Sequence, residues 1–261
     1  MDKAGKRSIL DVDVVELDWP AALAFAAAAA DSERQSVFAF LNANNANLAM
    51  RNGAFRKVLQ EAVVLPDGIG VDIASRAFYG KAFPANLNGT DFVPALLTYI
   101  TTPKRVALIG AGPDVFERVT ADFARHAPWH TFIPIADGFF DRRSSGEILG
   151  RLAEARPDIL LVAMGSPGQE IWVHENIGTG HGRLVITVGA LFDFVSGSVP
   201  RAPERLRALR LEWAYRLWVE PSRLWRRYIL GNPVFLFHVA RYWLRGRMAQ
   251  TGRAAGRERA R

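Results

Sequence analysis

A single aspartate, Asp67, is the side chain in this sequence best placed for acid–base chemistry. It follows an apolar run at residues 63–65, which predicts a short buried strand, and Pro66 ends that strand. From Ile69 onward the apolar positions follow helical spacing. The Asp67 carboxylate is therefore expected between a strand and a helix, at the sheet edge where open α/β folds bind ligands. Two roles are open at this point: a general base, or a cap for the helix that begins near Gly70.

Polar or glycine residues also follow the other expected strands. Asn42 could recognise the hydroxyl groups of a ligand, or it could only form a turn. Gly110 and Gly112 belong to a turn whose backbone N–H groups could hold a diphosphate, although Gly-x-Gly alone is weak evidence of a dinucleotide site. Asp137 and Gln169 follow two further strands. Because the carboxyl ends of parallel strands share one edge of a sheet, these residues are predicted to form one site with the aspartate.

The alternation of strands and helices predicts the fold class. Strands are expected at residues 10–17, 37–41, 63–65, 106–109, 131–135, 159–163 and 184–188. Five strand–loop–helix units between residues 37 and 188 favour an α/β fold with a doubly wound, mostly parallel sheet.

The composition excludes several kinds of chemistry. The chain has 261 residues, of which 49% are hydrophobic, so it can bury a substantial core. It has no cysteine, which excludes disulfides, thiolate metal ligands and a cysteine nucleophile. Five scattered histidines, without a Ser-His-Asp or HExxH pattern, predict neither a metal ion nor another cofactor. Asp11 and Asp13 have the Asp-x-Asp spacing of some metal-dependent sugar transferases, but a position at a strand edge is favoured for them.

The net charge of +7 is unevenly distributed. From residue 201 onward the chain has 15 Arg, 4 Glu and no Lys or Asp, a net charge of +11, whereas the preceding residues carry −4. Such an arginine-rich segment favours an anionic partner. We therefore divide the chain into an α/β domain at residues 1–200, a basic helical appendage at residues 201–247 and a disordered tail at residues 248–261.

The appendage is predicted to lie on an anionic membrane surface. Amphipathic helices are expected at residues 204–218, 221–230 and 233–245. Arg223, Arg226 and Arg227 would share one helical face, and aromatic residues alternate with arginines, which is typical of interfacial helices. No segment is long enough to span a bilayer. The alternative is a cap that packs on the core, whereas a nucleic-acid partner is disfavoured because the aromatic residues follow helical spacing.

Together these residues predict a transfer reaction. One positioned carboxylate, amide side chains, a glycine-rich turn and trailing arginines suit transfer from an activated phosphate ester to a hydroxyl group. The carboxylate would act as the general base, and the arginines would neutralise phosphate charge. A non-catalytic scaffold protein is a further alternative, and the presence of Asp67 and Gln169 argues against it.

Several motifs resemble the WecG/TagA/CpsF glycosyltransferase family. They are LPDGIGV, NGTDF, GSPGQE, GALFDFVSGSVPRAP and LEWAYRLWVEPSRLWRRY, in matching order from about residue 37 to residue 228. The resemblance implies an inverting, metal-independent enzyme that moves a sugar from a UDP-sugar to an undecaprenyl-diphosphate-linked sugar. Such an enzyme would be cytoplasmic and peripheral on the inner face of the plasma membrane, in bacterial exopolysaccharide or cell-surface polysaccharide synthesis.

The same resemblance implies roles for individual residues. Asp67 matches the proposed base and Gln169 an active-site glutamine. The NGTDF motif places Thr90 and Asp91 among the substrate-binding residues. The arginines that the family is thought to close over its site correspond to Arg216, Arg223 and Arg226.

Two departures from the family pattern bear on the donor sugar. Phe40 stands where the family usually has threonine, and Asn86 where it often has arginine. Both changes favour a neutral donor, with UDP-glucose ahead of UDP-N-acetylmannosamine. The oligomeric state, the acceptor sugar and the linkage position do not follow from the sequence.

Overall fold

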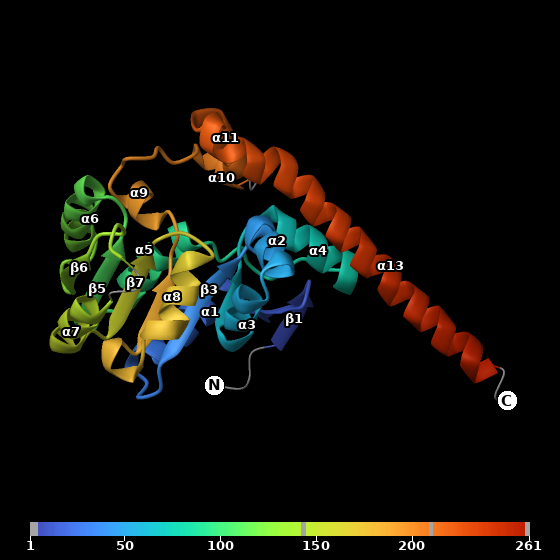
Figure 1. Cartoon of the computed structure of the whole chain (residues 1–261), viewed down its shortest axis with the longest axis horizontal. Coiled ribbons are helices and arrows are strands. Elements are labelled where there is room, and N and C mark those ends of the chain that lie inside the picture. The colour runs from blue at the N-terminus through green and yellow to red at the C-terminus, as the bar shows by residue number, and fades with distance from the viewer. Residues whose placement is uncertain (1–4, 142–144, 209–210, 259–261) are drawn as a thin grey trace.

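One eight-stranded sheet forms the centre of the molecule (Figure 1). The computed structural model describes residues 5–141, 145–208 and 211–258, with the backbone alone described at residue 208 and from residue 246 onward. The strand order is β1-β2-β4-β3-β8-β7-β5-β6, and all neighbours are parallel except the antiparallel pair β1 and β2. The strands are β1 Gly5–Ile9, β2 Val12–Glu16, β3 Ser36–Leu41, β4 Val63–Pro66, β5 Arg105–Gly110, β6 Thr131–Ala136, β7 Ile159–Ala163 and β8 Leu184–Thr187. The predicted α/β fold with a mostly parallel sheet is thus confirmed.

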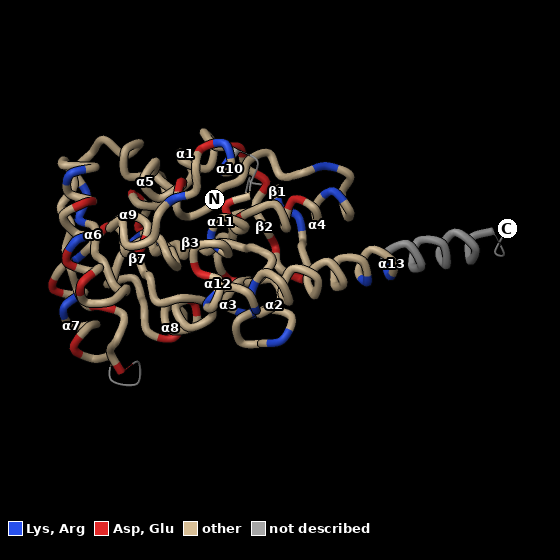
Figure 2. The backbone as a smooth tube through the Cα atoms, turned by 90° about the horizontal axis from the view of Figure 1, so that it is seen from above, with Lys and Arg blue, Asp and Glu red and all other residues tan. Residues whose placement is uncertain are grey.

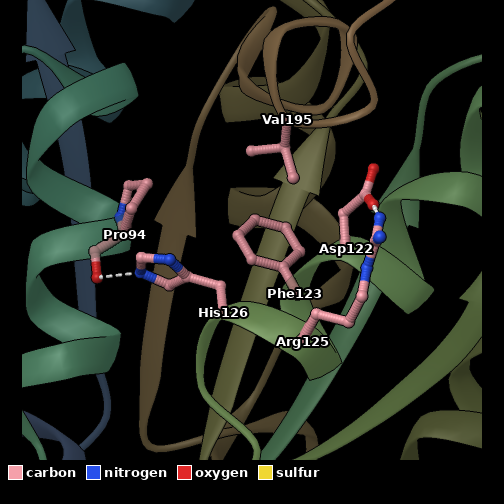
Figure 3. A pocket seen from close by; sticks show the side chains of 6 residues that line it. All are labelled: Pro94, Asp122, Phe123, Arg125, His126 and Val195. Carbon is pink, nitrogen blue, oxygen red and sulfur yellow. Dashed lines mark hydrogen bonds and ion pairs between the residues drawn. The ribbon is translucent and has the colours of Figure 1, made fainter.

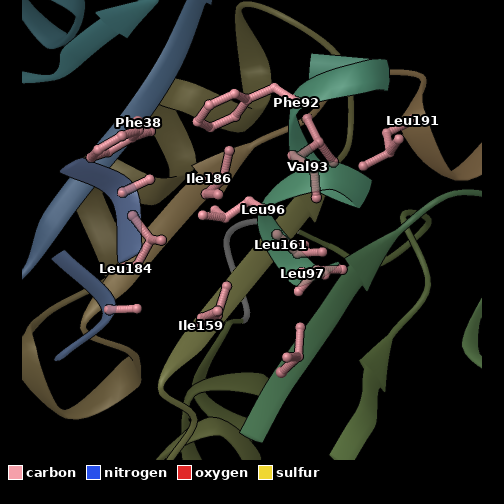
Figure 4. Close-up of a cluster of buried hydrophobic side chains, with 14 of the residues drawn as sticks. Phe38, Phe92, Val93, Leu96, Leu97, Ile159, Leu161, Leu184, Ile186 and Leu191 are labelled. Atoms are coloured by element: carbon pink, nitrogen blue, oxygen red, sulfur yellow. The ribbon is translucent and has the colours of Figure 1, made fainter. Parts of the chain in front are cut away.

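Helices cover both faces of this sheet, as a doubly wound fold requires. On one face, α1, α5, α6 and α9 pack on alternate residues of the central strands, such as Phe38, Leu161 and Ile186 (Figure 4). On the other face, α2, α3 and α4 cover β2 to β4, and α7 and α8 cover β5 and β7. These helices are α1 Trp19–Asp31, α2 Ala43–Arg51, α3 Gly53–Glu61, α4 Ile69–Tyr79, α5 Gly89–Tyr99, α6 Pro113–His126, α7 Gly146–Ala155, α8 Gly168–Asn176 and α9 Leu191–Val195. Burial on both faces explains why the central strands are continuous apolar runs.

The first predicted strand is in fact a hairpin. Leu10 and Asp11 form its turn, with φ of 49° and 66°, so the expected single strand at residues 10–17 was wrong. The missed strand β1 contains Arg7, which is only 3% exposed. Its guanidinium binds the Glu16 carboxylate, which Lys81 also contacts at 2.9 Å. These hydrogen bonds lower the pKa of Glu16 to about 2.

The C-terminal segment is helical, and its last part is one long helix. Its elements are α10 Glu204–Ala208, α11 Glu212–Val219, α12 Pro221–Trp225, the π-helical turn η2 Arg226–Leu230 and α13 Gly231–Glu258. The break expected at residues 231–233 is absent: the π turn ends at Leu230, and α13 begins at Gly231 and continues through Pro233. The predicted disordered tail is helical as far as Glu258, and residues 259–261 lie outside the described residues.

The beginning of α13 is part of the core. It lies beside α2 and α4, as the view from above also shows (Figure 2). Phe235 and Val239 are 1% and 5% exposed and belong to the same buried cluster as Leu41 and Val64. The Asn47 side chain donates a hydrogen bond of 2.7 Å to the carbonyl of residue 231. The core-packing alternative therefore describes this face of α13 correctly.

Candidate functional site

A large cavity lies at the carboxyl edge of the sheet, between the strand ends and the C-terminal helices. Its volume is about 1270 Å³. The loops after β3, β4, β5, β6, β7 and β8 line one side, and residues of α11, α12, η2 and the start of α13 line the other. In Figure 1, α10 and α11 lie above the sheet and an extended segment joins them to α9. The predicted convergence of the strand ends is therefore present, and the appendage closes over it.

Asp67 lies in this cavity with one carboxylate oxygen available. Its backbone N–H donates to the Leu41 carbonyl at 2.9 Å, which ties the turn after β4 to the end of β3. Its Oδ2 accepts a hydrogen bond of 3.0 Å from Asn42 Nδ2, whereas no described residue donates a hydrogen bond to Oδ1. Gly68, with φ of 87°, is the N-cap of α4, and no side chain caps that helix. The capping alternative for Asp67 is thus wrong.

The environment of Asp67 pushes its pKa in two directions. Burial disfavours the charged carboxylate and raises the pKa above its usual value. The Asn42 hydrogen bond and the positive charges of Arg227 and Arg216 oppose this rise, while the Asp91 carboxylate adds to it. The result is a carboxyl group with a raised pKa facing an open space, which is the arrangement of a general base.

Asn42 orients the Asp67 carboxylate. Its Oδ1 accepts a hydrogen bond of 3.0 Å from the Asn45 backbone N–H and so caps α2, while its Nδ2 holds Asp67. The Asn42 side chain therefore has partners within the protein, and its role in hydroxyl recognition stays a prediction. Asn45, which the sequence interpretation missed, lines the cavity and lies 3.4 Å from Ser166 Oγ.

Gln169 joins the loops after β7 and β8. Its Oε1 accepts hydrogen bonds from the backbone N–H groups of Met164, Gly165 and Gly189, at 3.2, 3.1 and 3.2 Å. Its Nε2 donates to Glu170 Oε1 at 2.8 Å, and Ser166 Oγ donates to the same oxygen at 2.7 Å. Burial raises the pKa of Glu170, and these two hydrogen bonds oppose the rise. Gln169 thus shapes the cavity floor, although it also lines the cavity as predicted.

The glycine turn after β5 brings a third loop to the site. A side chain at Gly110 would collide with the Ala163 carbonyl at 2.2 Å, so only glycine fits between β5 and β7. Gly112 and Ala111 line the cavity, whereas Gly110 and Asp137 stay outside its lining. Asp137 instead accepts a hydrogen bond of 2.8 Å from the backbone N–H of Phe139. The Phe139 ring lines the cavity with 81% of the residue exposed, and sequence analysis did not single it out.

Asp91 anchors the appendage. Arg201 Nη2 donates to Asp91 Oδ1 at 2.7 Å, and Arg207 lies 3.5 Å from the same oxygen. Burial would raise the Asp91 pKa, but hydrogen bonds from Asn88 and Arg201 and the two guanidinium charges hold it below its usual value. Arg201 also donates to the Thr90 carbonyl at 3.4 Å, which Pro94 leaves without its helical partner. Thr90 and Asp91 therefore lie at the cavity, and Asp91 is occupied by arginines.

The predicted arginines separate into two groups. Arg216 and Arg223 line the cavity, and each lies within 4 Å of Glu220, at 3.6 and 3.2 Å. Arg226 is exposed, lies outside the cavity lining and contacts the Trp225 ring at 5.4 Å. Arg227 lines the cavity in its place. The structure therefore brings Arg216 and Arg223 to the site, and Arg227 rather than Arg226.

Metal ligands do not cluster in the described part of the chain: no group of three His, Asp or Glu side chains there could hold an ion. Asp11, half of the Asp-x-Asp pattern, lies in the hairpin turn and accepts a hydrogen bond of 2.6 Å from the Tyr242 hydroxyl. Independence from metal remains a prediction.

A second pocket, of about 470 Å³, lies between α5 and α6 (Figure 3). Its polar side chains bond within the protein: Arg125 pairs with Asp122, and His126 Nε2 lies 3.1 Å from the Pro94 carbonyl. This pocket is therefore a weaker candidate than the cavity around Asp67.

Comparisons with known proteins agree with the motifs. The model of the glycosyl transferase WecG/TagA/CpsF family matches residues 7–249. The chain is 33% identical over 196 residues, 74% of each chain, to the N-acetylglucosaminyldiphosphoundecaprenol N-acetyl-beta-D-mannosaminyltransferase of Bacillus spizizenii. It is 32% identical over 211 residues, 80% of each chain, to the protein of the same name from Bacillus subtilis.

Proposed function

The chain belongs to the WecG/TagA/CpsF family and is a glycosyltransferase, and we propose that it transfers a neutral hexose or N-acetylhexosamine from a UDP-sugar to a lipid-linked sugar. The lipid carrier would be undecaprenyl diphosphate, which the names of both relatives contain. The reaction would invert the anomeric carbon, use no metal ion and serve the synthesis of a bacterial polysaccharide.

The observation that carries this proposal is the Asp67 carboxylate, held by Asn42 with Oδ1 open to the cavity. In the proposed step, Asp67 takes the proton of the acceptor hydroxyl as its oxygen attacks the anomeric carbon of the donor. The bond from that carbon to the phosphate oxygen breaks, and UDP leaves with the electron pair. Attack from the face opposite UDP inverts the anomeric centre. Arg216 and the other cavity arginines are suited to stabilise the charge that develops on the diphosphate.

The strand order supports a direction for the donor. Phe139 follows β6, which is separated from β4 and Asp67 by β3, β8, β7 and β5. An exposed aromatic ring offers a stacking surface for a base. The Ala111 and Gly112 turn offers backbone N–H groups to the diphosphate. The donor would thus lie along the sheet edge, with uracil on the β6 side and the sugar on the Asp67 side.

The donor sugar is proposed only as a class. Phe40 packs under Gly89 and contacts the Phe92 ring in the core, and the Asn86 side chain accepts a hydrogen bond of 2.7 Å from the Gly68 N–H. Both residues therefore have structural roles that weaken the argument for glucose. UDP-glucose and UDP-N-acetylmannosamine remain the two donors of choice.

Because the proposed acceptor is a lipid, the enzyme would act at a membrane surface. Several apolar side chains of the C-terminal helices are exposed, including Trp218 at 80% and Phe237 at 64%. Arg241 and Arg245 of α13 are also exposed, and such a surface suits the headgroup region of an anionic bilayer. Within the described residues, no helix has the length and apolar character needed to cross a bilayer. We therefore propose peripheral attachment to the cytoplasmic face of the plasma membrane.

A donor screen tests the function. Purified full-length protein is incubated with UDP-glucose, UDP-N-acetylmannosamine, UDP-N-acetylglucosamine or UDP-N-acetylmannosaminuronic acid. Each donor is combined with undecaprenyl-diphosphate-linked glucose or N-acetylglucosamine, and the lipid products are separated and their molecular masses are measured. The proposal expects transfer of one neutral sugar. Transfer of the uronic acid alone, or no transfer with any pair, would contradict it.

A further inference from the structure

The arginines that line the cavity differ in whether a carboxylate already neutralises them. Arg207 lies 3.5 Å from Asp91, and Arg216 and Arg223 lie near Glu220. Arg227 forms no ion pair or hydrogen bond with any residue that the structure describes, and its Nε, like those of Arg207 and Arg216, is buried without a hydrogen-bond partner. A partly buried guanidinium without an ion-pair partner is suited to bind an anion that a ligand supplies.

Arg227 also acts on the proposed base. Among the positive charges that lower the pKa of Asp67, that of Arg227 has the largest effect, followed by Arg216. The other charged groups around Asp67 are carboxylates: Asp91 raises its pKa, and Glu212 is near enough for each to disfavour the other's ionisation. Arg227 and Asp67 line the same cavity, so the guanidinium lies near the place where an attacking hydroxyl and a sugar-linked phosphate would meet.

The neighbouring residue provides a contrast within the same π turn. Arg226 is exposed and contacts the Trp225 ring, outside the cavity lining. Arg227 is half-buried, lines the cavity and contacts the Tyr228 ring at 5.4 Å. Both residues have the same charge and nearly the same backbone position, so they differ mainly in the direction of the side chain.

We propose that Arg227, and not Arg226, is the residue of η2 that binds a sugar-linked diphosphate in the reaction centre. This inference rests on the proposed glycosyl transfer. The diphosphate belongs either to the donor or to the acceptor, since both carry one next to the reacting sugar. A guanidinium suits this task because its planar donors match two phosphate oxygens at once. When bound, the diphosphate supplies the anion that Arg227 lacks.

The test compares R227Q with R226Q in the full-length protein, with R227K as a second variant. R227Q should lower kcat/KM by about ten- to a hundredfold, as expected for the loss of a charge-assisted contact. R226Q should stay within about threefold of the wild type, and R227K should recover part of the loss. R227Q should also move the acid limb of the kcat/KM profile to higher pH, because Asp67 loses its strongest positive neighbour.

Two measurements identify the diphosphate. Weaker UDP binding by R227Q in calorimetry assigns the donor, whereas unchanged UDP binding with a raised acceptor KM assigns the acceptor. Equal effects of R226Q and R227Q, or wild-type kinetics of R227Q, would overturn the proposal. A failure of the proposed function is distinguishable from both, because the wild-type enzyme itself would then form no product in the donor screen.

Discussion

Replacing Asp67 with asparagine removes the proposed base and leaves the shape of the side chain nearly unchanged. In D67N the amide oxygen can still accept the 3.0 Å hydrogen bond from Asn42 Nδ2, and α4 loses nothing because Asp67 does not cap it. The change removes the proton acceptor, which is worth about 10²- to 10⁴-fold in rate, or about 2.7–5.4 kcal/mol of transition-state stabilisation. We therefore expect kcat to fall by that factor.

The electrostatics of the site predict how the other properties of D67N should behave. Burial raises the pKa of Asp67 in the fold, so its ionised form destabilises the protein once the pH exceeds the unfolded value of 3.8. D67N should therefore unfold at a temperature no lower than that of the wild type. Its affinity for UDP should not decrease, because a negative charge leaves a site lined by arginines.

The assay follows lipid-linked product over a range of pH. Wild-type kcat/KM should decrease as the pH falls through the raised pKa of Asp67, since the protonated carboxyl cannot accept a proton. The residual activity of D67N should lack this acid limb. A folded D67N enzyme that retains UDP binding and turns over within tenfold of the wild-type rate would refute Asp67 as the base.

Three further predictions concern stability, metal and membrane. Because the pKa of Glu16 is about 2 in the fold and 4.5 as its reference, its ion pairs should stabilise the protein above pH 4.5 and be lost as the pH falls toward 2. In urea unfolding, the stability of E16Q should depend less on pH in this range than that of the wild type, and the same pH dependence in both proteins would contradict this. Excess EDTA should leave transfer intact, and a loss restored by Mg²⁺ or Mn²⁺ would indicate a missed metal site. F237E should reduce co-sedimentation with phosphatidylglycerol vesicles by about ten- to a hundredfold, as the loss of one apolar side chain from a bilayer surface predicts. Y99E, on the other face of the sheet, serves as the control, and equal vesicle binding by the two variants would argue against α13 as the contact surface.

The position of the site could be predicted from the sequence because it depends on strand ends. Apolar runs identified the parallel strands, and the residues directly after them had to share one edge. Asn42, Asp67 and Gln169 were found in this way, and all three line the cavity. Their partners could not be found, because Gln169 bonds to Gly189, 20 residues away, and no local pattern encodes that contact.

Where prediction failed, the cause was a contact or a backbone geometry that spacing does not encode. Arg226 and Arg227 are equivalent by helical spacing, and only the structure distinguishes the cavity-facing side chain from the exposed one. Strand β1 was not predicted because an arginine such as Arg7 is expected at the surface. In the structure Arg7 is buried, and Glu16, Ser75 and two backbone carbonyls accept its hydrogen bonds. Ion pairs and hydrogen bonds to other segments hold Arg7 in β1 and anchor the appendage at Asp91.

The burial of Phe235 and Val239 among core residues limits how this enzyme can be rebuilt. An appendage that only contacted a membrane could be exchanged between relatives without changes in the α/β domain, and a chain ending near Val199 would keep its fold. Here the same helix that follows the cavity arginines also completes the layer over α2 and α4. A chimaera would therefore have to carry the matching faces of those two helices, and an enzyme without α13 should aggregate before it can be assayed.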